Sequence, residues 1–408
     1  MRYARKSCHR PAASESLAYD GARGHARVSH ASILPGATIG FLGGGQLGRM
    51  TALAAREMGY DVRVLDPEAN CPASPIATET IVAGWDDVEA ATRLARSSDV
   101  VTIEIERVGV ACLEATARYV PTHPGAAALA IVQHRARQKD WLVSQGFPVG
   151  EYREAGSAAE CAAAVTAWGP CYIKASTGGY DGRGQIRVSQ ASECEDAWRA
   201  LRASRCVVER ALALDVEISV MVARRPAGDQ AVFPVALNHH DAGQLAWSVI
   251  PALIDPAIAA RATEIGVGVA AALGVVGLLA IEMFVLRDGR LLINELAPRP
   301  HNSFHHTVEA CVTSQFEQLV RAVCNLPLGA TDIVRPAAIA NVLGDAWSRG
   351  RAPDFAAALG VPGTRMHLYG KHDPRAARKM GHLAAVADTP ENARAAVLDA
   401  LHRLRRGA

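Results

Sequence analysis

Short apolar segments alternate with amphipathic segments of helical period from residue 37 onward, and this alternation constrains the fold most. Each apolar run is too short for a buried helix, and several end at glycine or at a carboxylate. The expected strands are 37–43, 61–66, 79–83 and 99–104, with helices at 49–58 and 87–96. Strands separated by helices are typical of a parallel sheet covered on both faces. The sequence therefore predicts an α/β domain over residues 36–125.

A longer region of mixed pattern follows. We expect helices at 126–145 and 191–203, strands at 171–174, 184–188, 206–209 and 216–223, and a large core over 231–326. The last block has short strands, a basic loop at 371–379 and a C-terminal helix. This pattern predicts α+β structure, divided into domains at 126–330 and 331–408.

The most apolar run, 265–281, decides whether the chain contains a membrane segment. It is shorter than the roughly 20 residues that span a bilayer, and four glycines interrupt it. We interpret it as the end of a core helix, a glycine cap and the start of a buried strand. No transmembrane segment is predicted.

Charge and cysteine usage limit the partners and the compartment. Lys and Arg total 43 against 41 Asp and Glu, so we expect neither nucleic acid nor a membrane as a partner. Nine scattered cysteines, never in a CxxC pair, favour reduced, buried thiols and a cytoplasmic protein. Residues 1–35 are basic at their start and lack apolar periodicity. They weakly resemble a transit peptide, but an unstructured extension or an early start codon is favoured, and we exclude them from the fold.

A glycine cluster follows the first predicted strand, with the spacing Gly43-x-Gly45-x-x-Gly48. Such a turn lets the backbone and a helix N-terminus approach a phosphate. Asp66 could then hold a ribose hydroxyl, as in a nicotinamide-dependent oxidoreductase. The same pattern also serves other phosphates or a simple strand-helix turn, so this hypothesis is the least favoured.

A second glycine-rich loop, 175–183, comes directly after Lys174 at the end of an apolar strand. Its N–H groups and Arg183 could face a triphosphate while Lys174 bridges the phosphates. No Gly-Lys-Ser/Thr is present, so this is not a Walker loop. The alternative is a surface hairpin with turn glycines.

Two acids, Glu282 and Glu295, lie in apolar runs on either side of a turn at 288–289. Buried, unpaired carboxylates are costly, so a partner is expected. With Asn294 they form an oxygen-rich set suited to Mg²⁺ holding nucleotide phosphates. Structural salt bridges are the alternative.

A proline-stiffened loop carrying Arg299, His301, Asn302 and His305 follows the second acid. The two histidines suggest zinc, but neither an HExxH pattern nor a cysteine completes a site. We expect this loop to position an anionic substrate.

Together these features resemble the ATP-grasp superfamily and, more narrowly, the N5-carboxyaminoimidazole ribonucleotide synthetase family, over residues 39–401. The most specific stretches are 44–50, 178–185, 294–303, 314–317 and 378–382. The resemblance implies a Rossmann-like pre-ATP-grasp domain, a two-lobed ATP-grasp domain and a small C-terminal domain. It also implies an ATP-dependent ligase of purine biosynthesis that carboxylates aminoimidazole ribonucleotide with bicarbonate, uses ATP and one or two Mg²⁺ ions, and forms a homodimer.

The resemblance also implies roles for individual residues. Those expected to bind the nucleotide are Arg135, Lys139, Lys174, Gly179, Tyr180, Asp181, Gly182, Arg183, Gly184, Gln185, Glu209, Arg210, Ala211, Leu212, Glu217, His240, Asn294 and Glu295. Those expected to bind Mg²⁺ are Glu282 and Glu295. Those expected to bind the ribonucleotide are Gln46, Leu47, Glu104, Tyr180, Asp181, His301, Asn302, Lys371, Arg378 and Lys379. Those expected to act in catalysis are Lys174, Asp181, Arg299 and His301.

Several positions depart from the family pattern. Arg107, Leu237, Ala246 and Phe304 stand where Asn, Glu, Arg and Gly are usual, and an Arg is replaced near Ser176 and Thr177. They leave room for an ATP-grasp ligase acting on another amine, such as a formate-using glycinamide ribonucleotide transformylase. A catalytically silent nucleotide-binding subunit is a further alternative.

Overall fold

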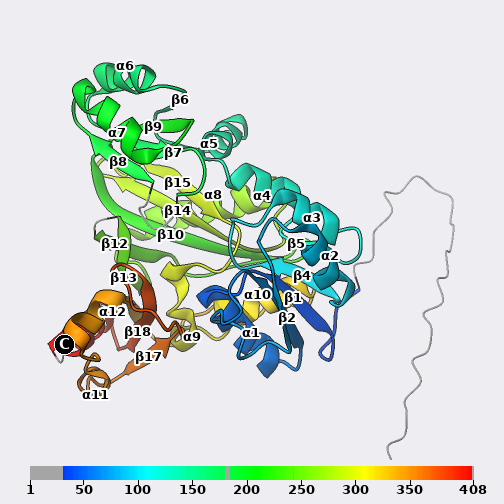
Figure 1. The fold of residues 1–408 in the computed structure, drawn as a ribbon. Helices are drawn as coiled ribbons and strands as arrows, with labels where there is room; N and C mark the ends of the chain where they lie inside the picture. Colours follow the sequence, from blue (N-terminus) through cyan, green and yellow to red (C-terminus); the bar gives the residue numbers. More distant parts are fainter. Residues whose placement is uncertain (1–30, 180–183, 242, 407–408) are drawn as a thin grey trace, which may run out of the picture. The chain divides into compact units, whose positions relative to one another are not determined.

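The computed structural model describes residues 31–179, 184–241 and 243–406. The fold below is that of the unit Ser32–Ala408. Its described residues form sheets of five, four and nine strands (Figure 1). The predicted combination of α/β and α+β structure is confirmed.

The five-stranded sheet is parallel throughout, with the order β3-β2-β1-β4-β5. Its strands are β1 (Thr38–Leu42), β2 (Asp61–Asp66), β3 (Glu79–Val82), β4 (Val100–Ile103) and β5 (Thr122–His123), and its helices are α1 (Gln46–Glu57), α2 (Val88–Arg96) and α3 (Val110–Thr116). All of the predicted strands are present. Helix α1 starts three residues earlier than predicted, because Gly45 is extended and acts as its N-cap.

The four-stranded sheet is antiparallel, with the order β6-β9-β7-β8. Its elements are β6 (Tyr152–Ala155), α6 (Ala158–Trp168), β7 (Cys171–Ala175), β8 (Gln185–Val188), α7 (Cys194–Leu201) and β9 (Cys206–Arg210). In Figure 1, α6 and α7 cover one side of this sheet.

The prediction of a single helix over 126–145 is wrong. The structure has two helices there, α4 (Ala126–Val132) and α5 (Arg135–Ser144). His134 adopts an extended conformation between them, and its side chain accepts a hydrogen bond from the Arg137 N–H. This side-chain cap starts a new helix, which the continuous apolar period does not reveal.

The nine-stranded sheet has the order β15-β14-β10-β12-β13-β16-β18-β17, with β11 paired to β10. Its strands are β10 (Leu214–Arg224), β11 (Gln230–Val232), β12 (Ala236–Asp241), β13 (Gln244–Ile250), β14 (Gly277–Leu286), β15 (Leu291–Ala297), β16 (Ala337–Leu343), β17 (Thr364–Leu368) and β18 (Lys379–Val386). Strand β16 pairs directly with β13. The last three strands of the chain therefore extend the sheet of the middle region.

The apolar run 265–281 folds as the sequence predicts. Helix α8 (Pro256–Leu273) ends at Gly274, whose φ is 64°, and β14 begins at Gly277. Within the described chain, α8 is the one helix that has the length and apolar character to cross a bilayer. One of its faces packs on β10, where Gly266 lies close against Val220.

The remaining helices cover the nine-stranded sheet and connect it to the five-stranded one. They are α9 (Thr307–Ala310), α10 (Gln315–Val323), α11 (Phe355–Leu359) and α12 (Pro390–Arg406). Helix α10 packs on β14 and also on α1, whereas α12 covers β16 and β18 (Figure 1). Just after the C-terminal end of α10, the carbonyls of Asn325 and Cys324 accept hydrogen bonds from the Ser32 hydroxyl and the Ile33 N–H. Ser32 and Ile33 fall within the predicted extension 1–35 but are part of this fold.

Candidate active site

A cleft of about 1460 Å³ receives side chains from all three sheets. The predicted site residues that line it are Gln46, Leu47, Glu104, Arg135, Lys139, Lys174, Gly179, Gln185, Glu209, Arg210, Ala211, Leu212, Glu217, His240, Glu282, Asn294, Glu295, Arg299, His301, Asn302, Lys371, Arg378 and Lys379. Gly184 borders β8 outside the lining, and Tyr180, Asp181, Gly182 and Arg183 lie outside the described residues. Residues separated by more than 300 positions thus converge on one cavity.

The two acids lie opposite each other on neighbouring antiparallel strands, with Glu282 of β14 paired to Glu295 of β15. The register shifts immediately afterwards, so that Asn294 is an extra residue on β15. A bulge of this kind re-aims side chains that would otherwise alternate between faces. Asn294 Nδ2 lies 3.3 Å from Glu282 Oε2, and both Asn294 and Glu295 line the cleft.

The pKa values of the two acids are shifted in opposite directions. Burial, together with the Glu295 carboxylate, raises the pKa of Glu282 to about 7. Although burial opposes it, the nearby Arg135 and Lys174 lower the pKa of Glu295, and Arg135 Nη1 lies 3.0 Å from Glu295 Oε2. A divalent cation between the two carboxylates would stabilise the charged form of both. The oxygen donors of Glu282, Glu295 and Asn294 therefore suit Mg²⁺.

Two lysines, Lys139 of α5 and Lys174 of β7, lie close to the acid pair. Glu209 bridges them, with 2.9 Å to Lys174 Nζ and 3.3 Å to Lys139 Nζ. Burial opposes ionisation of Glu209, but the two lysines lower its pKa to about 2. Lys174 Nζ also lies 3.5 Å from Asn294 Oδ1, so the lysines and the acids share one cavity. The family resemblance implies that Glu209 binds the nucleotide, whereas its carboxylate here also links the two lysines.

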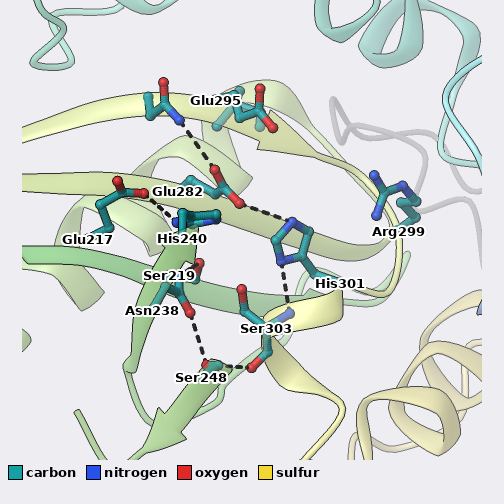
Figure 2. Close-up of polar contacts among 12 residues, drawn as sticks. Glu217, Ser219, Asn238, His240, Ser248, Glu282, Glu295, Arg299, His301 and Ser303 are labelled. Atoms are coloured by element: carbon teal, nitrogen blue, oxygen red, sulfur yellow. Dashed lines mark hydrogen bonds and ion pairs between the residues drawn. The ribbon is translucent and has the colours of Figure 1, made fainter. Parts of the chain in front are cut away.

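His240 and Glu217 form a second polar pair on the floor of the cleft (Figure 2). The distance between His240 Nδ1 and Glu217 Oε2 is 2.7 Å. Burial alone would lower the pKa of His240, but the Glu217 bond and the nearby Glu282 raise it. Glu217 belongs to β10, which lies beside β14, and His240 belongs to β12, which lies beside β10.

The glycine cluster and the basic loop meet at the other end of the cleft. Lys371 Nζ donates to Gln46 Oε1 at 2.8 Å and also to the Lys379 carbonyl at 2.8 Å. Beside them, Glu104 accepts a hydrogen bond from the Gly48 N–H, and burial raises its pKa. A Cβ at position 45 would lie 2.6 Å from Glu104 Oε1, so a larger residue there would displace this buried carboxylate. The two loops are therefore joined at a single basic pocket.

The loop after β15 contacts two separate parts of the cleft. Arg299 Nε lies 2.8 Å from Glu106 Oε2, a pairing that the sequence alone did not reveal. His301 Nε2 lies 3.3 Å from Glu282 Oε1, and burial, with Arg299 and Lys379 nearby, lowers the pKa of His301 well below its usual value. Both polar atoms of the Asn302 side chain are buried without a hydrogen-bond partner among the described residues. Such an amide is available to a bound molecule.

Asp66 does not lie as a ribose ligand would. One of its carboxylate oxygens accepts the Gly44 N–H at 2.8 Å, and the other accepts the Glu68 N–H at 2.9 Å. Asp66 therefore stabilises its own glycine turn. Because both carboxylate oxygens already accept main-chain hydrogen bonds, this finding argues against a nicotinamide-dependent oxidoreductase in which Asp66 holds a ribose hydroxyl.

The family departures lie mostly away from the cleft. Leu237 belongs to the main hydrophobic core, Ala246 lies on β13, and Phe304 is fully buried with its ring 6.2 Å from that of Phe233. Arg107 does line the cleft, where its guanidinium stacks 5.0 Å from the Trp85 ring. In the part of the chain that the structure describes, no group of three or more His, Cys, Asp or Glu could hold a metal by itself.

A four-stranded antiparallel sheet that faces a larger sheet across two lysines and two acids defines an ATP-grasp protein. Family profiles agree: the ATP-grasp domain matches residues 140–316, the ribonucleotide synthetase preATP-grasp domain 36–133, and the phosphoribosylaminoimidazole carboxylase C-terminal domain 337–396. The chain belongs to the N5-carboxyaminoimidazole ribonucleotide synthase family.

Individual relatives support this membership. The synthase of Bacillus subtilis is 39% identical over 87% of this chain and 93% of its own, and that of Brucella melitensis is 41% identical over 87% and 98%. A crystal structure of such a synthetase with ADP is 40% identical, with a TM-score of 0.85 over 92% of this chain and 99% of its own. The Aspergillus clavatus enzyme, solved with ADP and 5-aminoimidazole ribonucleotide, is 32% identical, with a TM-score of 0.83 over 91% and 99%.

Proposed function

We propose that the protein uses ATP and bicarbonate to carboxylate the exocyclic amine of 5-aminoimidazole ribonucleotide, forming N5-carboxyaminoimidazole ribonucleotide in purine biosynthesis. One observation carries the proposal: a single cleft joins the lysine–acid centre to the basic pocket of Lys371 and Gln46. A relative solved with ADP and this ribonucleotide supports the choice of substrate.

The lysine–acid centre suits the first chemical step. Bicarbonate is a poor electrophile, so we propose that ATP phosphorylates it to carboxyphosphate. Transfer of a phosphoryl group depends mainly on positioning and on balancing negative charge. Lys139, Lys174 and Arg135 would contact the phosphates, while the segment 209–212 would bind adenine and Glu217 the ribose. A magnesium ion held by Glu282 and Glu295 would neutralise phosphate charge.

In the second step the amine nitrogen bonds to the carboxyl carbon of carboxyphosphate, or of CO₂ released from it; the C–O bond to phosphate breaks, inorganic phosphate leaves, and the amine loses a proton to give the carbamate. We propose that Lys371, Arg378 and Lys379 hold the phosphate of the ribonucleotide, with Gln46, Leu47 and Glu104 beside them. His301 and Asn302 lie between this pocket and Glu282, so they would face the reacting amine and carboxyl group. Carboxyphosphate is labile in water, so its formation inside the cleft, next to the amine, would limit its loss by hydrolysis.

The test is phosphate release from ATP, measured with and without each of the other substrates. We expect release to require both bicarbonate and 5-aminoimidazole ribonucleotide. Release that depends on formate and glycinamide ribonucleotide would instead identify a transformylase. ATP binding without turnover under any of these conditions would identify a silent subunit, and either result would overturn the proposal.

A cytoplasmic location and a homodimer are also proposed. The eight described cysteines are all free and buried, which suits a reducing compartment. The homodimer rests on family resemblance. Light scattering of the purified protein tests it, and a monomeric mass at micromolar concentration would contradict it.

A further inference from the structure

A row of buried polar side chains crosses the nine-stranded sheet beneath the loop that carries His301. Asn238 of β12 lies between two serines, with 2.7 Å from its Nδ2 to Ser219 Oγ and 2.9 Å from its Oδ1 to Ser248 Oγ (Figure 2). Ser219 and Ser248 are fully buried, and Asn238 is 6% exposed. Each side chain of the row has a hydrogen-bond partner, but apolar side chains of the same shape would pack about as well, so the row calls for a purpose beyond packing.

The row lies on the face of the sheet that carries the acids. Ser219 pairs across strands with Glu282, and Asn238 pairs with Glu217 on one side and with Ser248 on the other. Cross-strand partners point to the same face. The polar row is therefore continuous with the floor of the cleft.

The row ends on the main chain of the His301 loop. Ser248 Oγ lies 3.0 Å from the Ser303 carbonyl oxygen. The Ser303 N–H in turn donates to His301 Nδ1 at 3.4 Å, while His301 Nε2 faces Glu282 Oε1 at 3.3 Å. A ring nitrogen that accepts a hydrogen bond carries no proton, so this arrangement favours the tautomer with the proton on Nε2.

We propose that Ser248 and Asn238 are positioning residues that hold Ser303, and through it keep the Nε2–H of His301 directed at Glu282. The inference rests on the proposed function, because it assigns His301 and Glu282 to the reacting centre. Neither Ser248 nor Asn238 lines the cleft, so both would act only through the loop.

The hydroxyl proton of Ser248 explains why an asparagine stands beside it. Ser248 has one proton and two acceptors in range, Asn238 Oδ1 and the Ser303 carbonyl. The Asn238 nitrogen donates to Ser219, and its oxygen shares the Ser248 proton with the Ser303 carbonyl. A carboxylate at position 238 could not donate, and it would draw that proton away from the loop.

Two variants test the proposal, Ser248→Ala and Asn238→Asp. We expect each to lower kcat for carboxylation by roughly ten-fold or more, because small misplacements of reacting groups are costly, while KM for ATP changes little. Thr116→Val is the matched control: Thr116 is also fully buried and donates to a main-chain carbonyl, that of Leu113, away from the cleft. Urea unfolding of all three variants identifies any loss of activity that comes from reduced stability.

A second readout does not depend on turnover. Long-range ¹⁵N–¹H spectra of histidine-labelled protein, with the His301 signal assigned by its loss in His301→Gln, report the tautomer. We expect the Nε2–H form in the unmodified protein and in Thr116→Val, and a mixture or the Nδ1–H form in Ser248→Ala. An unchanged tautomer together with kcat within two-fold would overturn the inference. Absence of carboxylation in the unmodified protein would overturn the proposed function instead, and the spectra would still test the positioning.

Discussion

Glu295 is one of two facing carboxylates that are held at close range in a buried cleft. Glu295→Gln removes the charge proposed to bind Mg²⁺ and changes the volume very little. We therefore expect turnover to fall by about a hundred-fold or more, while the urea midpoint of unfolding stays close to that of the unmodified protein. Phosphate release and circular dichroism measure the two quantities.

The control for this variant is Glu264→Gln on the exposed side of α8, where the same chemical change should affect neither quantity. Retained turnover in Glu295→Gln would remove Glu295 from the metal site.

Lys371 tests the other end of the cleft. Its ammonium contacts Gln46 and the Lys379 carbonyl, where we propose that the ribonucleotide phosphate binds. Lys371→Ala should raise KM for the ribonucleotide by about ten-fold, as expected for losing a charge-assisted contact, and KM for ATP much less. Steady-state kinetics with each substrate varied in turn gives both values.

Arg365→Ala, an exposed cation on β17, is the matched control for Lys371→Ala. A larger effect on KM for ATP than for the ribonucleotide would place Lys371 outside the phosphate pocket.

At the scale of residues, the sequence predicts which residues line the cleft, but it does not predict which side chains contact one another there. The glycine loops, the two acids and the basic loop follow from motifs, and the described members do meet in one cleft. The Glu106–Arg299 and Glu209–lysine contacts join segments whose spacing in the chain bears no relation to their distance in the fold. The row from Ser219 to Ser248 has no local signature, because serine and asparagine in strands are usually exposed.

At the scale of elements, Gly266 determines how closely α8 packs on β10. A Cβ at this position would lie 2.7 Å from Val220 Cγ1. Gly266→Val should therefore destabilise the protein by about 1–3 kcal/mol, the usual range for overpacking, even though valine favours a helix more than glycine does. Urea unfolding measures the change.

Ala272→Val places the same side chain on the exposed side of α8 and should change the free energy of unfolding by less than about 0.5 kcal/mol. Equal losses for both variants would show that the contact with β10 is not the cause.

Element boundaries were predictable where a residue has a special conformation, and not where a side chain makes the boundary. Gly274 and the apolar runs on either side of it predict the α8–β14 junction correctly. The break at His134 depends on a hydrogen bond from Arg137 to the histidine ring, and this residue type is not among the strong capping residues. The bulge at Asn294 likewise follows from strand pairing and not from the strand's own pattern.

At the scale of the whole molecule, buried neutral histidines make stability depend on pH. Burial lowers the pKa of His306 to about 3, and both of its ring nitrogens lack a hydrogen-bond partner within the described structure. The unfolded chain binds a proton near pH 6.5 and the folded chain does not. The contribution to stability is therefore complete above pH 6.5 and is lost as the pH falls toward 3.

His306→Leu should reduce this acid sensitivity. Between pH 7 and pH 5 the loss of unfolding free energy should be smaller than in the unmodified protein by about 2 kcal/mol, since each pH unit below 6.5 contributes about 1.4 kcal/mol. Urea unfolding at the two pH values measures it. His402→Gln, an exposed histidine on α12, is the control, and an unchanged pH dependence in His306→Leu would contradict the prediction.

The classes of structure were predictable from alternating patterns, whereas the joining of the middle and last regions into one sheet was not. The sequence predicts a large core over 231–326 and short strands in the last block, but the pairing of Trp247 of β13 with Ala340 of β16 leaves no trace in either segment. Strand order depends on contacts over more than 80 residues of chain, which periodicity does not encode.

The pairing of β13 with β16 also determines where the chain can be cut. A fragment that stops at residue 330 would lack β16, and the seven residues of β13 would present bare main-chain N–H and C=O groups to solvent. An uncovered strand of this kind recruits strands from other molecules, so such a fragment should form aggregates. The last strands of the chain thus keep the edge of β13 paired, and so protect from aggregation the part of the molecule that is proposed to bind the nucleotide.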